Sequence, residues 1–63
     1  MDKREFKAGY KSGKDTIIKY GYEYTFNYWK SKFTYMDQFS TNAVISYWIG
    51  YGKAIAEKAP LND

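Results

Sequence analysis

The side chains best suited to chemistry in this sequence are aromatic and basic. Half of the sixteen residues from 20 to 35 are aromatic, and the 63-residue chain holds eight tyrosines in all. Eight tyrosines exceed what a core of this size can satisfy, because each buried hydroxyl needs a hydrogen-bond partner. Tyr and Trp also dominate the binding hot spots of protein interfaces. We therefore expect a protein-binding surface with these contact candidates: Tyr22, Tyr24, Tyr28, Trp29 and Tyr35.

Phosphate binding by lysine is a second chemistry that the sequence offers. Residues 1–20 carry six Lys or Arg against three acids, a balance equal to the net charge of +3 for the whole chain. Lysines interleaved with aromatic rings, as in residues 28–33, can pair with phosphates and stack on bases. The chain has one Arg, so a solubilising surface is the competing interpretation. The alternative expectation is an RNA- or ribosome-binding regulator that uses one basic helix face: Lys3, Lys7, Lys11 and Lys14.

Catalysis and metal binding have little to draw on. The chain has no His and no Cys, which removes the commonest general base and the usual transition-metal ligands. It has no G-x-S-x-G elbow, and the glycines lack the spacing of a phosphate-binding loop. We expect no catalytic residues, no metal site and no cofactor.

The size of the chain allows one small domain, residues 1–63. A domain of about 60 residues buries only about 60% of the surface of its unfolded chain, and small scaffolds usually need a staple. Without Cys or His the remaining staple is self-association, so we expect a homodimer. The charged start, Met1 to Glu5, precedes no apolar signal region, and no run approaches the roughly 18 apolar residues of a membrane span. These features predict a cytoplasmic protein without membrane contact.

The elements that must position these residues are mostly helical by pattern. Phe6, Tyr10, Gly13 and Ile17 share one helix face, which predicts a helix over 3–19 with Gly21 as its C-terminal cap. A helix over 40–58 would begin at Asp37, Ser40 or Thr41 and end before Pro60. The pairs Gly9/Gly13 and Gly50/Ala54 each lie four residues apart. Such spacing predicts a close helix crossing, within one chain rather than between two.

The aromatic segment 22–36 fits two patterns. Tyr22, Phe26, Trp29, Phe33 and Met36 form a full helical stripe, which favours a helix with this stripe as core or dimer seam. Alternation of aromatic and polar residues over 22–28 instead fits a strand, and thus a β-hairpin at about 22–36. The fold prediction is all-α, a small dimerising three-helix domain, with an α+β domain as the alternative.

Two short stretches resemble known small proteins. Residues 6–13, FKAGYKSG, and residues 47–54, YWIGYGKA, are similar to the two helices of ribosome modulation factor-like proteins and to small bacteriophage accessory proteins. The resemblance implies a helical, non-catalytic protein that binds something large. The leading expectation is a phage-encoded protein that binds and modulates or inhibits a host macromolecule, such as a defence or regulatory protein, in the host cytoplasm.

Overall fold

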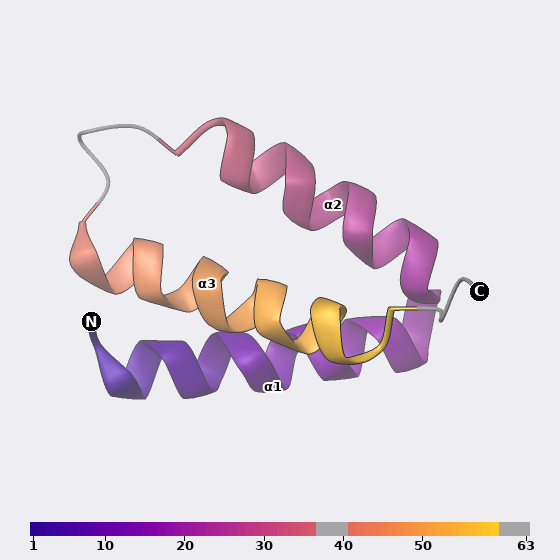
Figure 1. Ribbon diagram of the computed structural model, residues 1–63, viewed down its shortest axis with the longest axis horizontal. Coiled ribbons are helices and arrows are strands. Elements are labelled where there is room, and N and C mark those ends of the chain that lie inside the picture. The colour runs from indigo at the N-terminus through magenta and orange to yellow at the C-terminus, as the bar shows by residue number, and fades with distance from the viewer. Residues whose placement is uncertain (37–40, 60–63) are drawn as a thin grey trace.

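The computed structural model describes residues 1–36 and 41–59, which form three helices and no strand. They are α1 (Lys3–Tyr20), α2 (Tyr22–Thr34) and α3 (Asn42–Glu57). Figure 1 shows that α1 and α3 run in the same direction, while α2 returns across them. The all-α prediction is confirmed. The alternative prediction of a central β-hairpin is wrong, because the helical period of the aromatic segment outweighs its short strand-like alternation.

Local signals in the sequence account for the helix ends. The Asp2 side chain caps α1 by accepting from the Glu5 backbone N–H at 3.1 Å. Gly21, with φ of 93°, separates α1 from α2, as its predicted capping role requires. Thr41 caps α3 by accepting from the Val44 N–H at 3.2 Å, whereas the other two predicted caps lie outside the described residues. α2 ends at Thr34, two residues short of its predicted end.

Close backbone contact between α1 and α3 forms the centre of the molecule. A Cβ atom on Gly9 would overlap the Tyr47 carbonyl oxygen, and one on Gly50 would overlap the Phe6 carbonyl oxygen. A Cβ on Gly13 would lie 2.9 Å from the Ala54 Cβ. The predicted crossing of small residues within one chain is therefore confirmed.

Side chains beside this crossing complete the buried core. Tyr51, Ala54 and Ile55 of α3 are buried. Ser46 is also buried, and its Oγ accepts a hydrogen bond from the Asp2 backbone N–H at 2.8 Å. This bond ties the start of α1 to α3 and leaves no orphaned hydroxyl in the core.

α2 is attached through one indole and one buried threonine. The Trp29 Nε1–H donates to the Trp48 carbonyl oxygen at 2.8 Å, and the indole lies so close to Gly52 that a Cβ there would be 2.8 Å from it. Thr25 is fully buried, and its hydroxyl donates to the Gly21 carbonyl at 2.7 Å. The aromatic residues of α2 are all half-buried or exposed, so its rings lie beside the core and not inside it.

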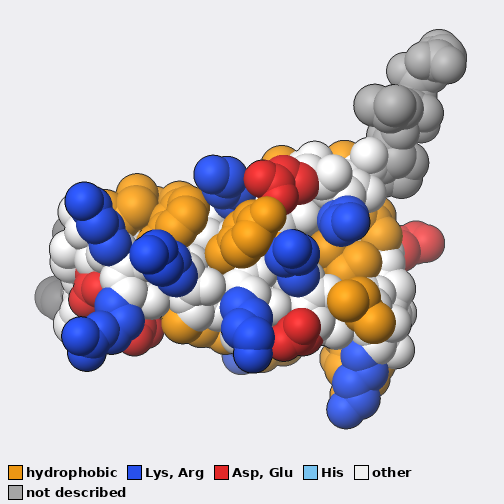
Figure 2. Space-filling model, turned by 90° about the horizontal axis from the view of Figure 1, so that it is seen from below, with side chains coloured by type: hydrophobic (Ala, Val, Ile, Leu, Met, Phe, Trp, Pro, Cys, Tyr) orange, Lys and Arg blue, Asp and Glu red, His pale blue; other side chains and the backbone are white. Residues whose placement is uncertain are grey.

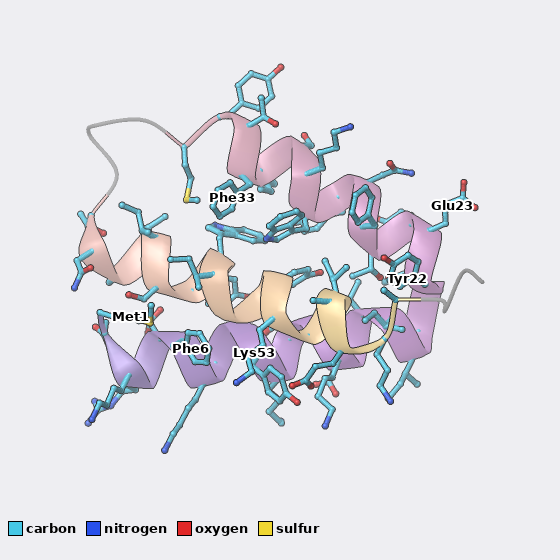
Figure 3. All side chains as sticks on the ribbon, in the orientation of Figure 1. Met1, Phe6, Tyr22, Glu23, Phe33 and Lys53 are labelled. Atoms are coloured by element: carbon cyan, nitrogen blue, oxygen red, sulfur yellow. The ribbon has the colours of Figure 1, made fainter. Side chains whose placement is uncertain are left out.

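The predicted aromatic stripe of α2 is thus only partly a core face. None of its five members is buried, and Phe33, which points toward α3 in Figure 3, is 39% exposed. Phe33 therefore does not lie in the core, and its other predicted place, a dimer seam, stays a prediction.

The structure also bears on membrane contact. Within residues 1–36 and 41–59, none of the helices is both long and apolar enough to span a membrane.

Candidate functional site

A pocket of about 230 Å³ opens where the three helices meet, and we call it the tyrosine pocket. The last turns of α1 and one face of α2 line the sides of the pocket, and α3 contributes to its floor. Four tyrosines and one threonine line it: Thr16, Tyr20, Tyr24, Tyr28 and Tyr51. The lining consists of ring faces and hydroxyl groups, without a charged side chain.

The rings of the pocket form a connected row. Tyr20 and Tyr24 have centroids 4.9 Å apart, and Tyr24 and Tyr28 lie nearly parallel with centroids 6.4 Å apart. Tyr28 reaches across to Tyr51 at 6.2 Å. Tyr24 and Tyr28 lie four residues apart on one face of α2, and Tyr20, the last residue of α1, joins them across the break at Gly21.

Exposure separates the walls of the pocket from its floor. Tyr20, Tyr24 and Tyr28 are 54%, 52% and 40% exposed, whereas Tyr51 is 2% exposed. The walls therefore present ring surface to an incoming group, and the floor is fixed by the core.

The Tyr51 hydroxyl is held protonated. Burial raises the pKa of this phenol above its ordinary value of 10.0, and the hydroxyls of three neighbouring tyrosines raise it further, whereas a hydrogen bond with Thr16 opposes them. Thr16 in turn donates to the Ser12 carbonyl at 2.7 Å. The floor of the pocket is thus a neutral hydroxyl pair at physiological pH.

Two lysines lie against the rings of two tyrosines that line the pocket. The Lys19 ammonium lies 5.2 Å from the Tyr20 ring centroid, and the Lys32 ammonium lies 5.5 Å from that of Tyr28. These contacts put positive charge at both ends of the row of exposed rings, around a lining that is itself uncharged.

The predicted contact residues are divided by the structure. Tyr24 and Tyr28 line the pocket, while Tyr35, 82% exposed, follows the end of α2 and does not. Tyr22 is half-buried with its ring 6.1 Å from that of Phe26, and Trp29 is engaged in the contact between α2 and α3. The pocket therefore unites two of the five predicted residues.

Three pocket residues were absent from the predicted set. The four-residue spacing of Tyr20 with Tyr24 and Tyr28 is a signal that could have added Tyr20. Thr16 and Tyr51 come from other helices, and their place depends on the crossing of α1 and α3. No local pattern marks either of them.

The predicted basic face lies along α1. Lys3, Lys7, Lys11 and Lys14 are all exposed, and Figure 2, which looks onto α1 from below, shows basic side chains spread along the molecule with acidic ones among them. The Lys14 ammonium lies 5.3 Å from the Tyr10 ring centroid. Basic charge is therefore distributed along this face instead of concentrated in one cluster.

Aromatic rings on this side are already engaged within the fold. The Tyr10 hydroxyl donates to the Glu57 carboxylate, and this hydrogen bond raises the pKa of Tyr10. The Lys53 ammonium lies 5.7 Å from the Phe6 ring centroid, and Figure 3 shows the two side chains next to each other. This side of the molecule offers fewer free ring faces than the tyrosine pocket.

Comparison with known proteins finds no matching family model, no matching curated protein and no matching solved structure.

Proposed function

We propose that this protein is a small non-enzymatic binding protein that docks on an acidic surface of another protein through the tyrosine pocket. The observation that supports the proposal most is the row of three exposed tyrosines above a buried fourth. Tyrosine combines large contact area with a polar tip, and interfaces concentrate their binding energy in such residues.

The positive charge of this protein indicates that the proposed partner presents an acidic surface. The net charge of +3 and the lysines beside the pocket favour an acidic protein surface, because complementary charge speeds encounter and suppresses wrong partners. Together with the resemblance to small bacteriophage proteins, this extends the proposal to a host-cell protein whose activity changes when it is bound.

Self-association is a separate part of the proposal. Phe33 and Tyr35 near the end of α2 and Val44 in the first turn of α3 are exposed. Figure 1 shows the end of α2 and the start of α3 at the same end of the molecule. We propose that a second copy of the chain covers this end. The pocket, lined from other turns of the helices, would stay open in such a dimer.

Affinity capture from a host lysate, with and without nuclease, tests the docking proposal. Capture should survive nuclease and be lost with the double variant Tyr24→Ala/Tyr28→Ala, which should weaken Kd by about 30-fold or more, since truncating a hot-spot tyrosine costs about 1 kcal/mol or more. The matched control is Lys3→Gln/Lys7→Gln, which changes exposed residues away from the pocket.

RNA binding by the basic face of α1 is the second candidate, favoured by the exposure of its four lysines on one helix. Salt separates the candidates. Binding through four phosphate contacts should weaken about 100-fold between 50 and 200 mM salt, whereas docking through the tyrosines should weaken less than about tenfold. Capture that nuclease abolishes, with the steeper slope, would replace the leading proposal with the RNA-binding one.

A further inference from the structure

We infer that the tyrosine pocket is an anchor site for one aromatic side chain of the partner protein, carried next to a carboxylate in the partner's sequence. This inference rests on the proposed docking function and names the group that the docking surface receives.

The shape of the pocket suits a single ring. Its volume is about 230 Å³, and its lining rings already pair at centroid distances between 4.9 and 6.4 Å. These distances are the ones at which aromatic rings prefer to meet in tilted or offset arrangements. An incoming ring could therefore pack against Tyr20, Tyr24 and Tyr28 at the same range of centroid distances. A smaller aliphatic side chain would leave part of the ring surface uncovered.

The floor of the pocket suits a ring with a polar edge. Tyr51 and Thr16 place two uncharged hydroxyl groups there. Neutral hydroxyls can both donate and accept, so they can pair with an indole N–H or a phenol of the incoming group. They cannot replace the counter-charge that a buried cation would need.

The charges around the pocket determine which type of residue can lie next to that aromatic residue in the partner. The Lys19 and Lys32 ammonium groups lie against Tyr20 and Tyr28, so a group packed on the row of rings has a cation near each end of the row. A carboxylate next to the aromatic residue would pair with one of them. A lysine or arginine there would be repelled, which distinguishes this pocket from an aromatic cage for cations.

Three capped peptides whose flanking residues are acidic, neutral or basic test the inference: Asp-Trp-Asp, Ser-Trp-Ser and Lys-Trp-Lys. Each is titrated into the full-length protein while the tyrosine ring resonances are followed by NMR. We expect the acidic peptide to bind several-fold more tightly than the neutral one, and the basic peptide to bind weakest. The shifts should concentrate on Tyr20, Tyr24 and Tyr28 and spare Tyr35. Asp-Ala-Asp should not bind, because it lacks the ring.

Two variants assign the two parts of the inference. Tyr24→Ala should abolish binding of all three tryptophan peptides, and thermal melting will show that this half-exposed position leaves the fold intact. Lys19→Gln/Lys32→Gln should leave the neutral peptide unchanged and remove the advantage of the acidic one. Lys3→Gln is the matched control and should change neither.

Several results would overturn the anchor. They are tightest binding of the basic peptide, equal binding of Asp-Ala-Asp, shifts centred on Tyr35, and no binding at all. If the peptides do not bind but capture of a partner is lost in Tyr24→Ala/Tyr28→Ala, the docking proposal is supported and the anchor inference is refuted. If the peptides bind as expected but capture is indifferent to that double variant, the pocket stands and the proposed function falls.

Discussion

At the scale of single residues, the glycines of this protein differ in what surrounds them. Gly9 and Gly50 face backbone carbonyl groups of the opposite helix, whereas Gly52 faces the Trp29 side chain. Backbone held in a helix cannot yield locally, but a side chain at the edge of the core can shift. The same substitution should therefore have different costs at the two kinds of position.

Gly9→Ala should destabilise the protein by about 3 kcal/mol or more, because the overlap with the Tyr47 carbonyl exceeds the roughly 1 kcal/mol gained in helix propensity. Gly52→Ala should cost about 1 kcal/mol, since the indole can move. Urea unfolding followed by circular dichroism measures both. Ala8→Gly on the exposed side of α1 is the control, with a cost of about 1 kcal/mol. A Gly9→Ala protein as stable as wild type would refute the backbone contact between α1 and α3.

The two tyrosines with raised pKa values predict the alkaline limit of stability. Both are neutral in the folded state beyond the ordinary value of 10.0, so folding retains protons that the unfolded chain releases. Their contribution is complete below about pH 10 and is lost as pH rises through the folded-state pKa values. Stability should therefore fall above about pH 10.

Ultraviolet titration of tyrosinate absorbance checks this order. Tyr10 and Tyr51 should ionise late, and Tyr51→Phe and Tyr10→Phe should each remove amplitude from the late part of the curve. Loss of early amplitude in Tyr51→Phe would contradict the burial of that hydroxyl.

Single residues also show what sequence patterns can and cannot predict. The close approach at Gly9, Gly13, Gly50 and Ala54 follows from their spacing, because small residues four apart share a helix face. Burial of Ser46 and Thr25 does not follow from their types, since both are usually exposed. Ser46 is paired with the Asp2 backbone N–H, which only the assembled helices bring within reach. The Thr25 hydroxyl bonds the carbonyl four residues earlier, so the burial of Thr25 comes from helix packing and not from that local bond.

At the scale of elements, α2 depends on a single indole for much of its attachment. Trp29→Phe should cost about 1 kcal/mol through the lost hydrogen bond to Trp48, and Trp29→Ala about 3 kcal/mol. Hydrogen exchange should then speed up in α2 while α1 and α3 stay protected, because those two contact each other directly. Tyr35→Ala serves as the control and should leave exchange unchanged. Uniform loss of protection in Trp29→Ala would mean that the three helices unfold as one unit.

The prediction of these elements succeeded where periodicity was long and failed where packing decides. The helical stripe from Tyr22 to Met36 identifies α2 correctly against the hairpin alternative. It does not reveal that Phe33 stays partly exposed, because that depends on how tightly the other two helices close. The same holds for the pocket. Its three wall tyrosines are spaced four residues apart in the sequence, whereas Tyr51 on its floor comes from α3.

At the scale of the whole molecule, the proposed dimer has a direct test. Multi-angle light scattering at micromolar concentration should give twice the 7.4 kDa chain mass. The melting temperature should rise with protein concentration, because association stabilises the folded state by mass action. Phe33→Ser/Val44→Ser should shift the mass to that of one chain, while Tyr24→Ala should not. A monomeric mass with a cooperative, concentration-independent melt would refute the dimer.

The parallel contact of α1 and α3 has a consequence for how the chain folds. Two of its cross-helix hydrogen bonds join residues 44 and 47 positions apart, so closing this contact requires most of the chain to come together as one large loop. Helical proteins usually fold fast because their contacts are local, but here the defining contact is among the least local that the chain can make. The rate-limiting event should be the encounter of the first and last thirds of the chain. The middle third, which carries Tyr24 and Tyr28 of the tyrosine pocket, would settle only after that encounter.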